Sequence, residues 1–144
     1  MECIELLVRK GKANINAANS WKLTPINVAM LLNHEGCVKL FLDFEGIDVN
    51  CKDEQGRTML MLSVQKQNDR SVDFLTYLLN KEADLRIVDV DGRSALHHLA
   101  GVNLRAWHGD PRANDKEKRL RIQLEVCRLL LNRGADRTAK DNNK

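Results

Sequence analysis

The sequence is poor in aromatic residues and proline, and it lacks any long apolar run. Its 144 residues include three Phe, two Trp, one Tyr and two Pro. No segment approaches the roughly 18 consecutive apolar residues that a membrane-spanning helix needs. The first residues, M-E-C-I-E-L-L-V-R-K, carry acids where a signal peptide is basic, and their apolar stretch is too short for one. These absences argue against membrane insertion and predict an intracellular protein, in the cytoplasm or the nucleus.

Cysteines at metal-binding spacing are also missing. The four cysteines, Cys3, Cys37, Cys51 and Cys127, lie far apart and form no C-x-x-C pair, whereas a zinc site needs paired spacing. We expect free thiols, with Cys37 and Cys127 at buried helical positions, because an unpaired cysteine behaves as a small apolar residue in a reducing compartment. No metal and no cofactor is predicted.

The chain lacks a strong charge of either sign outside one segment. A hydrophobic content of 43% with 30% charged residues favours a folded chain over a disordered one. The net charge of +3 arises entirely within residues 103–123, where six basic residues stand against three acidic ones. Any attraction to an acidic partner or to nucleic acid is therefore expected to be local.

What the sequence does contain is a repeat. The stretch Asp89–Ala100 reads D-V-D-G-R-S-A-L-H-H-L-A, and weaker copies read D-E-Q-G-R-T-M-L-M-L-S-V from Asp53 and N-S-W-K-L-T-P-I-N-V-A-M from Asn19. The hydroxyl residues of these copies, Thr24, Thr58 and Ser94, stand 34 and 36 residues apart. A period of this length indicates a stacked array of identical supersecondary units.

Each copy is followed by a second shared stretch, in which a leucine pair or Phe-Leu precedes a turn. The turns fall at Gly11, Gly46, Glu82 and Gly134. The pattern resembles the ankyrin repeat, a family that is written with an Asp-x-x-Gly-x-Thr-Pro-Leu-His opening, two short helices and a Gly-Ala-Asp close. The resemblance covers nearly the whole chain and implies an all-α helix-turn-helix solenoid with β-turn tips and a long insertion in the last repeat.

The resemblance divides the chain into one predicted domain of stacked units. The expected boundaries are a single ankyrin-like domain, 1–144, made of a half repeat, 1–18, two repeats, 19–51 and 52–88, a repeat with an insertion at about 101–115, 89–140, and the start of another, 141–144. A solenoid helix without a neighbour leaves apolar surface bare. The helix expected in the half repeat has no preceding partner helix, so we expect either a fragment of a longer protein or a chain with an unusual cap. A monomeric domain within a larger chain is predicted.

Local signals predict how the repeats begin and end. Thr24 is a candidate N-cap before Pro25 at the first helical position, and the helix that follows is apolar on almost all sides, which predicts burial on several sides. Lys22 stands where the pattern has a turn glycine, and Glu82 stands at a left-handed cap that normally takes glycine. Gly11 is expected to supply the same cap in the half repeat.

The last repeat is longer than the others because of the insertion. Gly109-Asp110-Pro111 must break any helix that runs through it, and Asn114 followed by Glu117 resembles a capping box. Beyond it, five polar residues recur at intervals of three and four, which predicts one exposed helical stripe and a helix that starts near residue 115. The stripe consists of Lys118, Arg121, Glu125, Arg128 and Asn132.

The sequence contains no nucleophile elbow, phosphate loop or H-E-x-x-H helix, and no catalytic residue is predicted. The resemblance implies that His97 hydrogen-bonds backbone between adjacent loops. His98 and Leu99 are bulky where the pattern prefers Leu and Ala, and we expect them to push the helices of their repeat slightly apart. The chain is therefore predicted not to be an enzyme.

The candidate binding residues lie in the turn tips. The core of the repeat fixes the Asp, Gly and Thr of each turn, whereas the other positions between Asp and Thr can vary. We expect Trp21 to anchor a bound peptide, with Arg57 and Arg93 as flanking cations, although Trp21 could instead pack on a neighbouring turn. The predicted partner-binding residues are Trp21, Lys22, Leu23, Glu54, Gln55, Arg57, Val90, Asp91 and Arg93.

The insertion has two interpretations, a tolerated surface loop or a second contact. In the second, the basic and aromatic residues of the insertion receive an acidic protein segment or a nucleic-acid backbone. These residues are Arg105, Trp107, His108 and Arg112. The predicted function is a protein-interaction module; the alternatives are nucleic-acid binding through the insertion, which too few aromatic residues make less favourable, and a regulatory domain beside an enzyme or channel.

Overall fold

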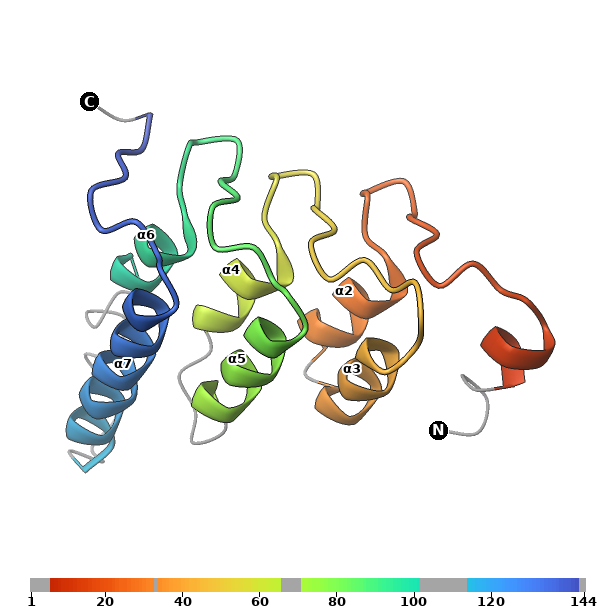
Figure 1. Ribbon diagram of the computed structural model, residues 1–144, viewed down its shortest axis with the longest axis horizontal. Helices are drawn as coiled ribbons and strands as arrows, with labels where there is room; N and C mark the ends of the chain where they lie inside the picture. The colour runs from red at the N-terminus through yellow and green to blue at the C-terminus, as the bar shows by residue number, and fades with distance from the viewer. Residues whose placement is uncertain (1–5, 33, 66–70, 102–113, 143–144) are drawn as a thin grey trace.

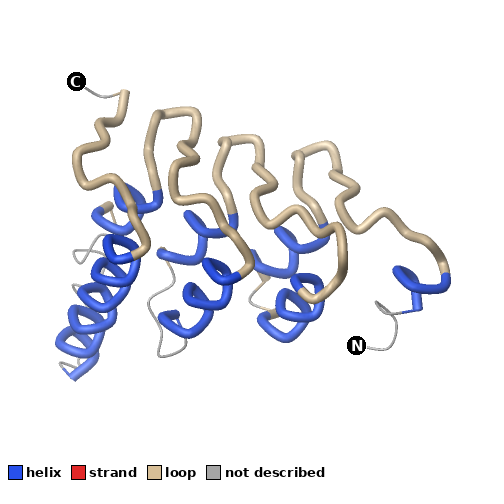
Figure 2. Tube along the Cα trace, in the orientation of Figure 1, coloured by secondary structure: helices blue, strands red, loops and turns tan. Residues whose placement is uncertain are grey.

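The computed structural model describes residues 6–32, 34–65, 71–101 and 114–142. Helices stack side by side, and the turns that join them form a row along one edge (Figure 1). Figure 2 shows helices and loops alone in the described part of the chain, with no strand. The elements are η1 (Leu6–Lys10), α2 (Pro25–Leu31), α3 (Glu35–Leu42), α4 (Met59–Val64), α5 (Ser71–Asn80), α6 (Ala95–Ala100) and α7 (Asn114–Asn132).

The helices form two rows of antiparallel pairs. Helix α2 packs on α3, α4 on α5 and α6 on α7, while α4 lies between α2 and α6, and α5 lies beside α7. This arrangement confirms the predicted all-α helix-turn-helix solenoid. No helix in the described ranges is both long enough and apolar enough to cross a membrane.

The inner helices begin where the sequence predicts. Thr24, Thr58 and Ser94 are the N-caps of α2, α4 and α6, all in extended backbone conformation, and Pro25 occupies the start of α2. An extended N-cap turns the chain into the helix while its side chain is free to bond the first turn. Helix α7 begins at Asn114, within a residue of the predicted start.

The apolar core runs through the middle of the array. Every residue of α4 is buried, because helices lie on both sides of it. The prediction that α2 is packed on several sides is wrong: Val28 is 37% exposed, Leu31 45% and Leu32 62%. Among the described helices, α4 is the only inner-row neighbour of α2, so one side of α2 meets solvent.

Two positions of the repeat take a left-handed backbone conformation. At the turn tips φ is 57° for Lys22, 73° for Gly56 and 76° for Gly92, which confirms that Lys22 replaces a turn glycine. At the helix ends, Glu82 has φ 64°, as predicted for a left-handed cap without glycine. A side chain in this region costs on the order of 1 kcal/mol.

The predicted left-handed cap at Gly11 is wrong, since Lys12 takes that conformation with φ 51°. The first helix, η1, is a π-helix, in which the Gly11 N–H donates to the Leu6 carbonyl at 3.0 Å, five residues back. A π-turn holds one residue more than an α-turn. The left-handed residue therefore falls one position later than the leucine spacing suggests.

Helix α7 is the longest element, with 19 residues against 8 in α3 and 10 in α5, and it extends beyond its neighbours (Figure 1). Its buried residues, Ile122, Val126 and Leu130, recur every fourth position. The predicted polar stripe from Lys118 to Asn132 is exposed throughout. The predicted break at Gly109-Asp110-Pro111 lies outside the described residues.

The cysteines that can be described are free thiols, as predicted. Cys37, Cys51 and Cys127 are half-buried, so the expectation of full burial for Cys37 and Cys127 is wrong. Burial raises the pKa of the Cys51 thiol, and the negative charge of Asp48 adds to the shift; the hydrogen bonds that the thiol shares with Thr24 and Asn27 act in the opposite direction. Cys3 lies outside the described residues.

Candidate functional site

Three turns of one design present the candidate residues, at 19–23, 53–57 and 89–93; we call these together the turn-tip surface. In the third turn, Oδ1 of Asp89 accepts the N–H groups of Asp91 at 2.9 Å and Arg93 at 2.8 Å. Asp53 does the same in the second turn, and Asn19 in the first. Because an Asx side chain satisfies the backbone at every tip, the side chains between are left for other contacts.

A cleft of about 340 Å³ lies between the second and third turns. The structure brings five of the predicted residues to it and leaves Trp21, Lys22, Leu23 and Glu54 outside. The cleft also contains residues that the sequence did not single out for binding. Its lining consists of Gln55, Arg57, Gln65, Asp89, Val90, Asp91, Arg93, His97, His98 and Gly101.

The two arginines of the cleft are held differently. Arg57 donates from Nε and NH2 to the buried Oδ2 of Asp53, at 2.9 and 2.8 Å. Arg93 is 40% exposed and approaches Asp91 at 3.4 Å and Asp141 at 3.9 Å. The Arg57 guanidinium is therefore fixed on its inner side, and that of Arg93 is only loosely paired.

The floor of the cleft is a buried polar chain. His98 Nε2 lies 2.8 Å from Asp89 Oδ2, and Gln65 Nε2 lies 3.0 Å from His98 Nδ1. Burial alone would raise the pKa of Asp89, but the Arg93 N–H, the His98 side chain and the Asp91 N–H hold that pKa below its usual range. His98 thus joins two repeats through Gln65, and the expected push on the helices of its own repeat stays a prediction.

His97 acts within its own repeat. Its Nδ1 accepts from the Ser94 N–H at 3.2 Å and lies 2.8 Å from Ser94 Oγ, which completes a capping box. The predicted bond to the backbone of an adjacent loop is not among the hydrogen bonds of the described residues, where His97 bonds Ser94 of its own repeat. With Nδ1 accepting, the neutral ring carries its proton on Nε2.

The first turn differs in its surroundings. Trp21 is 62% exposed, and Leu23 is half-buried. In the helix that follows this turn, Oδ1 of the fully buried Asn27 accepts hydrogen bonds from Thr24 Oγ1 and, at 2.8 Å, from Cys51 Sγ. The Asn27 Nδ2 atom has no partner within the described residues.

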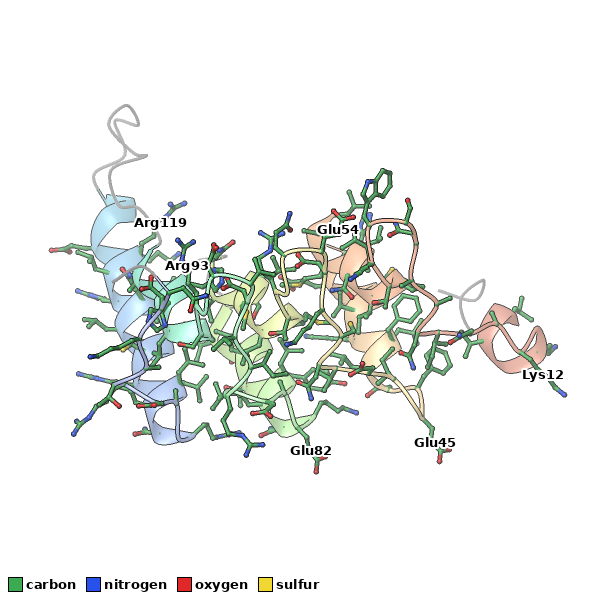
Figure 3. All side chains as sticks on the ribbon, turned by 90° about the horizontal axis from the view of Figure 1, so that it is seen from above. Lys12, Glu45, Glu54, Glu82, Arg93 and Arg119 are labelled. Atoms are coloured by element: carbon green, nitrogen blue, oxygen red, sulfur yellow. The ribbon has the colours of Figure 1, made fainter. Side chains whose placement is uncertain are left out.

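Figure 3 shows the two long edges of the molecule. Glu54, Arg93 and Arg119 lie along one edge, while Glu45 and Glu82 lie along the opposite one. Arg119 of α7 therefore adds a cation to the edge that carries Arg93. The predicted second contact cannot be located on this edge, because Arg105, Trp107, His108 and Arg112 lie outside the described residues.

Sequence comparisons give the chain a family and distant relatives. Residues 1–89 match the family model of ankyrin repeats in three copies, and residues 91–142 match that of the ankyrin repeat. The chain is 30% identical over 104 residues to the poly(ADP-ribose) polymerase tankyrase of Caenorhabditis elegans, covering 67% of this chain and 5% of the relative.

Two further relatives are matched over more of the chain. The nuclear factor NF-kappa-B p105 subunit of Gallus gallus is 30% identical over 133 residues, covering 85% of this chain and 13% of the relative. The neurogenic locus notch homolog protein 2 of Homo sapiens is 27% identical over 130 residues, covering 90% and 4%. The chain thus spans only a small part of the length of the curated relatives it matches.

Proposed function

The chain belongs to the ankyrin repeat family, and we propose that it binds a partner protein through the turn-tip surface, with the cleft between the second and third turns as the main subsite. Ankyrin repeats are protein-interaction modules and not catalytic ones. The proposal adds the place of binding on this chain.

The cleft is the observation that carries the proposal. Two successive repeats supply its walls, and the side chains that line it from Gln55, Arg57, Val90, Asp91 and Arg93 have no role in the apolar core. A cavity of about 340 Å³ lies at the lower end of the range for ligand pockets. It accommodates one or two side chains of a larger partner, which suits an extended segment laid across the tips.

The setting of this interaction is also proposed. We expect the chain to act as the scaffolding, targeting or regulatory part of a larger protein in the cytoplasm or nucleus. Nucleic-acid binding through residues 101–115 remains the rival proposal, and it rests on the charge excess of the sequence alone. Fold does not decide between such uses, since one scaffold serves unrelated partners.

Site-specific crosslinking tests the proposal. A photoreactive p-benzoyl-phenylalanine would replace Val90, which is 64% exposed beside the cleft, and in a matched variant Glu45, which is exposed on the opposite edge. After irradiation in nuclease-treated cell extract, we expect a discrete protein adduct from the Val90 variant alone. Adducts of equal yield from both positions, or from Glu45 only, would contradict binding at the turn-tip surface.

A further inference from the structure

We infer that the cleft recognises an acidic side chain, Asp or Glu, of the bound segment. The inference rests on the proposed function and specifies the chemistry of its main subsite. Three features of the cleft carry it: the occupied state of its buried carboxylate, the direction of its remaining donors, and the loose pairing of Arg93.

The buried carboxylate of the cleft is already saturated. Asp89 Oδ1 accepts from the N–H groups of Asp91 and Arg93, and Oδ2 meets Nε2 of His98, all within 2.9 Å. The Asp89 side chain is only 4% exposed. It therefore offers nothing to a cationic partner, although its negative charge lies in the floor.

Two of the groups that are left over are donors, and they lie in the same lining as the half-exposed Asp91 carboxylate. Arg57 uses Nε and NH2 on Asp53, and since a guanidinium has five N–H donors, NH1 remains available. The neutral His97 ring carries its proton on Nε2, which has no partner in the described part of the chain. Both side chains line the cleft, so the cleft favours a ligand rich in acceptors.

The present contacts of the Arg93 guanidinium with Asp91 and Asp141 are long enough for a partner's carboxylate to replace them. The Arg93 guanidinium lies 3.4 Å from Asp91 and 3.9 Å from Asp141, distances longer than a good charge-assisted hydrogen bond. Asp91 is itself about half exposed. A carboxylate from a partner can displace these contacts and bind the guanidinium in the bidentate geometry that arginine favours.

Arg57 supplies the rigid side of the site. Its side chain is 29% exposed and tied to a carboxylate that is 3% exposed, so little of its conformational freedom remains to be lost on binding. Preorganised donors gain affinity because the ordering cost is already met. A lysine or arginine of a partner would instead be placed beside two guanidinium groups.

Peptide selection tests the inference. Random 12-residue peptides displayed on phage would be selected on the immobilised chain, and we expect the enriched sequences to share one fixed Asp or Glu. The best peptide and its amide version, with Gln or Asn at the fixed position, would then be titrated by fluorescence anisotropy. We expect the amide peptide to bind roughly tenfold more weakly or worse.

Protein variants locate the contact. Arg57→Gln and Arg93→Gln should each lower the affinity for the acidic peptide and leave the affinity for the amide peptide nearly unchanged. This difference would show that the peptide carboxylate interacts with the arginine charge. Arg86→Gln is the matched control, because Arg86 is 88% exposed and does not line the cleft. If Arg57→Gln disturbs folding by freeing the buried Asp53, Arg93→Gln still tests the coupling.

The outcomes separate the inference from the proposed function. If the enriched peptides share no fixed acid, the inference is overturned. If these peptides still bind the Val90→Trp variant more weakly, the turn-tip site itself is supported. Acidic peptides that respond equally to Arg86→Gln and to the cleft variants would overturn both. A selection that enriches no peptide would count against the turn-tip surface as a segment-binding site, and so against both.

Discussion

The first and third repeats place different chemistry on the same scaffold. In the third, the buried His98 and Asp89 have partners at every oxygen and ring nitrogen within hydrogen-bonding distance. In the first, the buried Asn27 leaves Nδ2 unpaired within the described residues, and Lys22 is held in a left-handed conformation. A buried donor without a partner costs about 1–3 kcal/mol. We therefore expect the third repeat, whose buried polar groups are satisfied, to be more stable against local unfolding than the first.

The two repeats also differ in what they present at their tips. Leu23 occupies the position that Arg57 and Arg93 hold in the later turns. The first turn thus exposes Trp21 and apolar surface, and the later turns enclose a polar cleft. Asp89 is saturated by two backbone N–H groups and His98, so it pairs with neither guanidinium of the cleft. Arg57 instead pairs with Asp53, and Arg93 pairs loosely with Asp91 and Asp141.

Removing the saturated carboxylate should have the largest effect. We expect Asp89→Ala to lower the free energy of unfolding by about 3 kcal/mol, because His98 and two backbone N–H groups lose their acceptor. Asn19→Ala, the equivalent change in the first turn, should cost about 1 kcal/mol, since its two N–H groups can turn to water. Urea denaturation followed by circular dichroism measures both values, and equal losses would contradict the contrast.

Acid should weaken the third repeat through the same carboxylate. The pKa of Asp89 is lowered in the folded chain, so its stabilising contribution is present above its unfolded pKa of about 3.9 and is lost as the pH falls through the folded value. Asp89→Asn should therefore lose less free energy of unfolding than the unmodified chain between pH 5 and pH 2. Parallel slopes for the two proteins in urea melts across this range would exclude the coupling.

Substitutions at the left-handed tip residues should change the free energy of unfolding in opposite directions in the two turns. Gly56→Ala should cost about 2 kcal/mol, because φ is 73° and the new Cβ would lie 3.1 Å from the Val90 backbone nitrogen. Lys22→Gly should gain about 0.5 kcal/mol by relieving strain at the first tip. Both are read from urea midpoints, and a loss on Lys22→Gly would show that the lysine is not strained there.

Replacing the buried amide of the first repeat, and with it the Nδ2 donor that has no partner among the described residues, should have the smallest effect. Asn27→His recreates the Ser94–His97 capping box with Thr24 as the N-cap, and we expect a gain of about 0.5 kcal/mol in the free energy of unfolding. The same urea titration measures it. A loss instead of a gain would mean that the fully buried site cannot admit the larger ring.

The repeat period predicts the array and the starts of its inner helices, because it fixes where apolar faces and caps fall. The early start of α7 follows instead from the polar stripe between Lys118 and Asn132. The sequence could not predict that Val28 and Leu32 are exposed, because the apolar character of a residue does not reveal whether a neighbouring helix covers it. The π-turn before Lys12 was missed for a related reason: one extra residue per turn leaves the leucine pattern unchanged.

The candidate site was predictable in outline only. Turn tips follow from the Asp and Gly pattern, which is why Arg57 and Arg93 were found. The chain from Gln65 through His98 to Asp89 joins residues 33 and 9 positions apart, and it depends on the directions of side chains across a repeat boundary. No local pattern encodes those directions, although a histidine nine residues after a turn aspartate is a usable signal.

Helix α7 begins at Asn114, about two turns before Ile122, which is buried. Glu117, Leu120 and Arg121 are exposed, and the first amides of any helix lack carbonyl partners within it. The amide protons of these exposed residues should exchange with solvent faster than those from Ile122 onward, because the buried side chains of Ile122, Val126 and Leu130 hold the later turns in the core. We therefore expect the start of α7 to open locally while the rest of the helix stays packed.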